Sequence, residues 1–135
     1  RNVRQLPPNV SFVQAAALGC RFTTAYRALY EQGQLLVGET QQHRPKSVAR
    51  LGCGGLGLSC IVLAATAAAA SSESHSSTYP STPRMIIAVD VSQKALQKAK
   101  SLGATHLVHV QPHQSAQAIA QEIIRVAQDF SDDTA

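Results

Sequence analysis

The feature that most constrains the chain is a glycine-rich hexapeptide, GCGGLG, at positions 52–57. It matches G-x-G-x-x-G, a pattern that turns a strand sharply into a helix and brings backbone N–H groups against a diphosphate. Gly52 permits the tight turn, Gly54 removes a Cβ where the diphosphate must approach, and Gly57 lets the helix pack close to the strand. Alone the motif is weak, so its flanking segments decide what it indicates.

The flanking segments predict the strand before the motif and the helix after it that a dinucleotide-binding turn requires. Residues 47–51 predict a short strand, and Leu58 to about Ala70 predicts an alanine-rich helix. The apolar run MIIAV at 85–89 is typical of a parallel strand buried on both faces, and Asp90 closes it. A carboxylate there can accept hydrogen bonds from the ribose hydroxyls of adenosine and would repel a 2′-phosphate. The combination predicts a site for NAD rather than NADP.

The spacing between the two parts of this site is unusually long. Asp90 follows Gly57 by 33 residues, whereas about 20 are usual. The excess matches residues 71–83, which are rich in Ser and Pro without periodicity and predict a disordered insertion. It lies at the N-terminal ends of the strands, away from the ligand side, so it should add mainly loop-closure entropy.

The remaining elements are predicted from caps and apolar spacing. Before the motif, Ser11 with Gln14 forms a capping-box pattern that begins one helix, and a second covers roughly 22–32 before Gly33. After it come a helix over 93–102 between Ser92 and Gly103, a strand over 106–110 and a helix that Ser115 caps.

This order predicts an α/β fold, namely a Rossmann-type doubly wound parallel sheet. Only the first β-α-β-α-β-α half is expected, at 47–130, after a helical lead-in at 1–34. The whole chain, 1–135, is then a partial NAD(P)-binding domain. The polar tail after residue 130 is expected to fray.

Composition excludes several classes of protein. The net charge is +4, but the basic residues are scattered and aromatic residues make up only 4%, which argues against nucleic-acid binding. The apolar run 56–70 is too short to span a membrane. Three cysteines without paired spacing favour a reducing compartment, so we expect a cytoplasmic protein.

Four stretches together resemble the zinc-dependent alcohol dehydrogenases of the medium-chain dehydrogenase/reductase family. They are AAALGCRFTTAYRAL (15–29), LGCGGLGLS (51–59), MIIAVDVS (85–92) and ALQKAKSLGATHLV (95–108). The likeness covers about Leu6 to Gln128. It implies oxidation of an alcohol to an aldehyde or ketone with hydride transfer to NAD, assisted by zinc.

The resemblance also implies roles for particular residues. Cys20 looks like the third protein ligand to the catalytic zinc, although by itself a small buried apolar residue is the simpler interpretation. Thr24 looks like the residue beside the nicotinamide ring. The dinucleotide contacts would come from Gly52, Gly54, Gly55, Leu56, Gly57 and Asp90. The other zinc ligands would lie in a catalytic GroES-like domain that this chain lacks, so the isolated chain is expected to be inactive.

Some residues depart from the family pattern or lie outside it. Arg50 stands where the first strand normally has an apolar residue, so that strand is expected to be frayed or distorted. Position 95, where the family often has Lys, is Ala95, with Lys94 one place early. Cys53 and Cys60 are predicted to be packing residues. The five histidines predict no metal site, because His106 and His109 should point to opposite faces of a strand.

Three other functions remain open from sequence. A zinc-free quinone or enoyl reductase of the same superfamily would share the fold. An S-adenosylmethionine methyltransferase also uses a glycine-rich loop, but usually has an acidic residue just before the first glycine, where this chain has Arg50 and Leu51. A non-catalytic nucleotide-binding fragment is the third. Half a sheet exposes the edge of its first strand, so we expect self-association, and a homo-oligomer for the enzyme.

Overall fold

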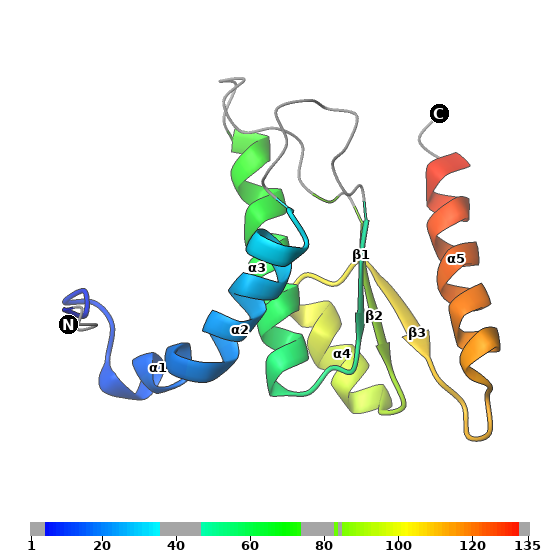
Figure 1. The fold of residues 1–135 in the computed structure, drawn as a ribbon, viewed down its shortest axis with the longest axis horizontal. Coiled ribbons are helices and arrows are strands. Elements are labelled where there is room, and N and C mark those ends of the chain that lie inside the picture. Colours follow the sequence, from blue (N-terminus) through cyan, green and yellow to red (C-terminus); the bar gives the residue numbers. More distant parts are fainter. Residues whose placement is uncertain (1–4, 36–46, 74–82, 84, 133–135) are drawn as a thin grey trace.

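Three parallel strands form the centre of the molecule (Figure 1). The computed structural model describes residues 5–35, 47–73, 83 and 85–132. The strands are β1 (Ser47–Leu51), β2 (Met85–Asp90) and β3 (His106–His109), and they lie in the order β1-β2-β3. Both pairings are parallel, with Ala49 opposite Ile87 on β2. The predicted α/β fold with a parallel sheet is confirmed.

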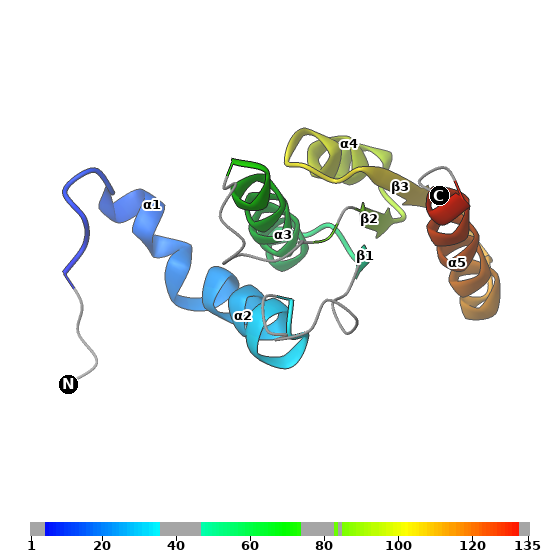
Figure 2. The same ribbon diagram turned by 90° about the horizontal axis from the view of Figure 1, so that it is seen from above.

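Helices alternate with the strands and cover both faces of the sheet. They are α3 (Gly55–Glu73), α4 (Gln93–Ser101) and α5 (Ala116–Asp132). Viewed from above, α3 and α4 lie on one side of the sheet and α5 on the other (Figure 2). This is the predicted β-α-β-α-β-α half of a doubly wound sheet.

Strand β2 is buried on both faces, as its unbroken apolar run predicts. Ile86 and Ala88 pack with α3 and α4 residues such as Ile61 and Leu96. The alternate residues Met85, Ile87 and Val89 pack with Val108 of β3, and the apolar stripe of α5 lies against them. That stripe comprises Ile119, Ile123, Val126, Ala127 and Phe130. The core is therefore two apolar layers separated by the sheet.

The lead-in differs from the two helices that the sequence predicts. It consists of α1 (Phe12–Ala16), a π-helical turn η1 (Leu18–Phe22), α2 (Thr23–Tyr26) and a second π-helical turn η2 (Arg27–Gln32). Only Ala17 separates α1 from the rest, because the sequence has no proline there to end the helix. The ends are as predicted, since Ser11 forms the capping box and Gly33 is the C-cap residue.

The lead-in is anchored to α3. Ala25 is fully buried, and the Tyr30 hydroxyl donates a hydrogen bond to the carbonyl of Leu63 at 2.9 Å. Burial raises the pKa of Tyr30, so the hydroxyl remains a donor at neutral pH. The contact holds the helix that carries Cys20 and Thr24 against the element that begins in the glycine-rich turn.

Helix α3 is longer at both ends than the sequence predicts. It begins at Gly55 rather than Leu58 and extends to Glu73, three residues into the segment 71–83. That segment contains no glycine or proline before Pro80, so the alanine-rich helix continues into it. Pro83, at its other end, is fully buried. Residues 74–82, where the rest of the predicted disorder falls, lie outside the described residues.

Strand β1 is regular, so the prediction that Arg50 frays or distorts it is wrong. Its pairing with β2 continues in register from Ser47 to Leu51, with Arg50 opposite Ala88. The backbone ladder tolerates arginine at the edge of the described sheet, where the residue is only half-buried. The cost appears in the side chain, whose Nε is buried without a hydrogen-bond partner.

No helix in the described part of the chain combines the length and apolar character that crossing a bilayer requires.

Candidate functional site

The glycine-rich segment lies at the junction of β1 and α3, as its motif predicts. Gly52 has a φ of +85°, a conformation that side chains rarely adopt. A Cβ on Gly57 would collide with the carbonyl oxygen of Gly52 and approach Arg50 Nε. Glycine at these two positions therefore lets the chain reverse while the first turn of α3 lies against the end of β1.

Gly54 and Gly55 have different surroundings. A Cβ on Gly54 would meet nothing within 4 Å, so the fold itself does not demand glycine there, and the open space could admit a ligand. A Cβ on Gly55 would lie 2.8 Å from Cζ and Nη1 of Arg21. The guanidinium of a lead-in residue thus lies directly on the first residue of α3.

Asp90 is bound to this turn. Its Oδ2 accepts a hydrogen bond from the backbone N–H of Cys53 at 2.6 Å, and its Oδ1 accepts one from Ser92 N–H at 2.7 Å. The backbone of Gly52 adds a bond from its N–H to the Val89 carbonyl at 2.8 Å. The two parts of the predicted site, 37 residues apart between Cys53 and Asp90, are in direct contact.

The same hydrogen bonds keep Asp90 ionised. The bond from Cys53 N–H, followed by that from Ser92 N–H, lowers the pKa of Asp90 below its ordinary value of 3.8, and partial burial opposes them only in part. Asp90 is therefore a negatively charged acceptor at neutral pH.

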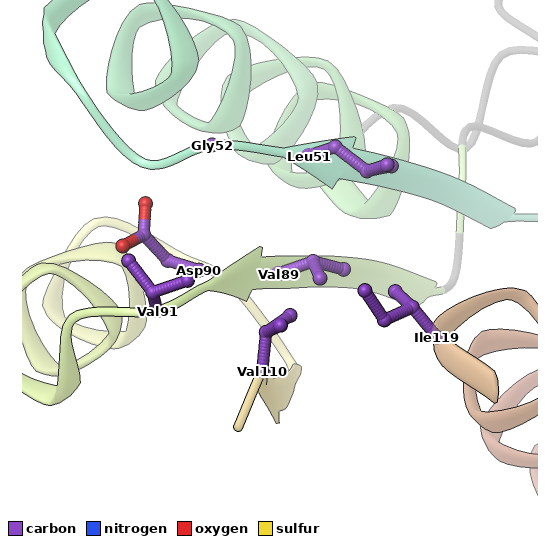
Figure 3. Close-up of a pocket in the computed structure, with 7 residues that line it drawn as sticks. All are labelled: Leu51, Gly52, Val89, Asp90, Val91, Val110 and Ile119. Carbon is purple, nitrogen blue, oxygen red and sulfur yellow. The ribbon is translucent and has the colours of Figure 1, made fainter. Parts of the chain in front are cut away.

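A pocket of about 230 Å³ opens beside Asp90 at the carboxyl ends of the strands (Figure 3). The Asp90 carboxylate points toward Gly52, and the other visible walls are aliphatic. The full lining is Leu51, Gly52, Val89, Asp90, Val91, Val110 and Ile119. An apolar wall with one ionised acceptor at its rim suits a flat ring attached to a hydroxylated sugar.

The structure places Cys20 and Thr24 on the lead-in, in η1 and α2, and both are exposed. Leu56, in the first turn of α3, is 37% exposed. Among the described residues, no group of three or more His, Cys, Asp or Glu side chains could hold a metal ion. Cys20 could therefore supply one ligand to a metal, but the described part of this chain does not complete a metal site.

The two cysteines predicted to be packing residues lie in the core. Cys53 and Cys60 are buried, and burial raises the pKa of both thiols, so they are protonated and unreactive at neutral pH. His106 packs edge-to-face on Phe130 of α5, while His109 Nε2 lies 3.0 Å from the Val91 carbonyl. The two histidines are on opposite faces of β3, as predicted. His43 and His75 lie outside the described residues.

Sequence reasoning missed one residue at this site, Arg21. The motifs place it only as the neighbour of Cys20, and its contact with Gly55 depends on how the lead-in packs against α3. The sequence does contain a signal, because GCRFTTAY carries a cation on an element that precedes the glycine-rich turn.

No profile of a known protein family matches the chain. Curated relatives nevertheless cover most of it. It is 27% identical over 135 residues to the alcohol dehydrogenase class-2 isozyme 2 of Oryctolagus cuniculus, covering 99% of this chain and 30% of that protein. It is 32% identical over 111 residues to alcohol dehydrogenase 1 of Tanacetum cinerariifolium, covering 82% and 24%.

Solved structures of oxidoreductases are also similar to the chain. The alcohol dehydrogenase of Thermus sp. ATN1 is 34% identical, with a TM-score of 0.56 over 78% of this chain and 24% of that one. A quinone oxidoreductase of Pseudomonas syringae pv. tomato, 20% identical, shares the fold with a TM-score of 0.65 over 93% and 31%. The chain spans about a quarter to a third of the length of these proteins.

Proposed function

We propose that this chain, which is similar to several alcohol dehydrogenases, is the NAD-binding part of an oxidoreductase of the medium-chain dehydrogenase/reductase family. The whole protein would oxidise an alcohol to an aldehyde or ketone, with a small-molecule alcohol as substrate. When bound, NAD supplies the hydride acceptor, and zinc supplies a Lewis acid for the alcohol oxygen.

One observation carries this proposal, the 2.6 Å hydrogen bond from Cys53 N–H to Asp90 Oδ2. It brings a carboxylate at the end of β2 to the mouth of a glycine turn that begins a helix. The start of α3 can offer backbone N–H groups and a partial positive charge to a diphosphate. Asp90 retains acceptor capacity for a ribose hydroxyl, because a carboxylate can accept about four hydrogen bonds and its two oxygens receive one each from Cys53 N–H and Ser92 N–H.

The shape of the neighbouring pocket supports the adenosine half of NAD. Val91 and Ile119 can pack against an adenine ring while Asp90 binds the attached ribose. The open space at Gly54 can then receive the diphosphate. In this arrangement Gly52, Gly54, Gly55, Leu56, Gly57 and Asp90 hold the cofactor, and Thr24 lies toward the nicotinamide end.

The charge of Asp90 supports NAD over NADP. Its hydrogen bonds lower its pKa, so it is ionised throughout the neutral range. A 2′-phosphate at the adenosine ribose would then lie beside a fixed negative charge, which would cost free energy.

Cys20 is the one residue of this chain that we propose as a zinc ligand. A thiolate from Cys20 can serve as one of three protein ligands, and the others would come from parts of the protein beyond the described residues. Its exposure leaves the sulfur accessible to a second domain. The three cysteines of the chain are all free, which supports a reducing, cytoplasmic location. Homo-oligomerisation is part of the same proposal.

A zinc-free quinone reductase is the second candidate. The likeness to the Pseudomonas quinone oxidoreductase is one of fold alone. It would use the same dinucleotide site and would lack the metal that Cys20 is proposed to bind. Metal analysis of the longest expressed form of the protein separates the two candidates, since stoichiometric zinc that is lost in Cys20→Ser supports the dehydrogenase.

NADH binding by the protein tests the main proposal, with fluorescence and calorimetry as readouts. We expect saturable binding of NADH that is tighter than binding of NADPH, and loss of most of this preference in Asp90→Asn. Lys100→Ala, an exposed change at the far end of α4, is the matched control and should leave both affinities unchanged. Absence of NADH binding, or S-adenosylmethionine displacing it, would contradict the proposal.

A further inference from the structure

We propose that Arg21 is a direct diphosphate-binding residue of this site, adding a cation to the backbone amides of the glycine turn. The inference rests on the proposed function and deepens it. The observation behind it is the position of the guanidinium, whose Cζ, Nη1 and Nε would all lie within 2.9 Å of a Cβ on Gly55. The whole charged group, rather than one end of it, lies over the start of α3.

The lack of a Cβ on Gly55 is what permits this contact. A methyl group there would push the guanidinium away from the helix start, since Arg21 rather than backbone fills the space. Gly55 differs in this respect from Gly52 and Gly57, whose backbone geometry requires glycine. The third glycine of the segment, Gly55, is therefore explained by a side chain that reaches it from the lead-in.

Arg21 has no carboxylate partner in the described part of the chain. The ion pairs there join Arg27 to Glu31, and Arg125 to Glu122 and Asp129. The side chain is exposed, so its N–H groups remain available to a ligand. An arginine held at a helix N-terminus without an anion favours occupation of that position by an external one.

The chemistry of the site identifies the anion. Arginine offers paired N–H donors that match two phosphate oxygens, which suits a diphosphate better than a single carboxylate. Asp90, the carboxylate at the turn, is negative and suits the sugar. The turn therefore has a positive side at Arg21 and a negative side at Asp90, and a nucleoside diphosphate has the matching order of groups.

The test compares Arg21→Gln with wild type for three ligands, NADH, ADP-ribose and adenosine. Charge-assisted contacts to phosphate predict about 10- to 100-fold weaker binding of NADH and ADP-ribose, with adenosine unchanged. A purely structural role would weaken all three alike. Arg27→Gln is the matched control, because it removes the same charge from the same helical path, where the side chain pairs with Glu31.

Gly55→Ala supplies an independent check. It should weaken NADH binding when Arg21 is present and have little further effect in the Arg21→Gln background, because both changes remove the same contact. NADH binding that is equal in wild type and Arg21→Gln would overturn the inference and leave the proposed function standing. A loss of adenosine binding as large as that of NADH would also overturn it, and no NADH binding by wild type would overturn both.

Discussion

Strands β1 and β2 are paired along their length but have very different surroundings. Every residue of β2 from Met85 to Val89 is buried, whereas β1 alternates between exposed and half-buried positions. Leu51 is 58% exposed, although its partner Val89 on β2 is only 3% exposed. The cause is helix α5, which packs on β2 and β3 and leaves that face of β1 uncovered (Figure 2).

This difference divides the candidate site into two unequal parts. Asp90 ends a strand that is fixed by packing on both faces, so the carboxylate is well supported. The glycine turn follows an edge strand with little cover. The hydrogen bonds from Gly52 N–H to Val89 and from Cys53 N–H to Asp90 connect the less supported part to the better supported one. The position of the turn therefore depends on β2 as well as on β1.

The largest effect should come from truncating β2 rather than β1. Ile87→Ala removes a side chain that is 1% exposed and should lower the free energy of unfolding by about 2–5 kcal/mol, because it leaves a cavity under α5. Leu51→Ala, on the same face of the neighbouring strand, should cost about 0.5 kcal/mol or less. Urea unfolding measures both. Equal losses would show that the β1 face is covered in solution.

An intermediate loss of stability is expected when the hydrogen bonds between Asp90 and the backbone are weakened. Asp90→Asn should lower the free energy of unfolding by about 1–3 kcal/mol at pH 7, because the amide nitrogen cannot accept one of the two backbone N–H bonds. The folded pKa of Asp90 is depressed, chiefly by the Cys53 bond. The carboxylate's contribution is thus complete well above the ordinary value of 3.8 and is lost as pH falls through the lower folded value.

The difference between wild type and Asp90→Asn should accordingly shrink on acidification below that ordinary pKa. Unfolding curves from pH 7 to pH 3 measure it, with Asp129→Asn as control because that aspartate is exposed on α5. A difference that stays constant with pH would mean that the carboxylate charge does not hold the turn.

Much of this arrangement follows from the sequence because its signals are local. The glycine motif predicts the strand-to-helix junction, the run MIIAV predicts a strand buried on both faces, and Ser92 predicts the start of α4. The meeting of Asp90 with the turn then follows from topology, since parallel strands place their carboxyl ends at one edge.

What the sequence misses depends on packing between distant segments. The contact of Arg21 with Gly55 requires knowing how the lead-in lies on α3. The continuous path of the lead-in depends on π-helical turns, which no residue pattern here marks. Arg50 misled the prediction about β1, because a pattern cannot tell an edge strand, where arginine can be accommodated, from a central one.

The smallest predicted effect on stability comes from replacing Arg50, which would make β1 more apolar and so more like β2. Arg50 is half-buried with its Nε unpartnered, and its charge lies near the protonated thiols of Cys53 and Cys60. Arg50→Met keeps an unbranched apolar side chain of similar reach and removes the buried donor. It should raise the free energy of unfolding by about 1 kcal/mol. Arg27→Met, at an exposed site, should give no such gain.

The two thiols supply a second readout for the same variant. The charge of Arg50 partly offsets the effect of burial on both, so its removal should raise the pKa of Cys53 and Cys60 further. Their modification by a thiol reagent at pH 8 should therefore be slower in Arg50→Met than in wild type, at a rate normalised to Cys20. A destabilised Arg50→Met with faster thiol modification would mean that the guanidinium is satisfied in solution and holds the base of α3 against β1.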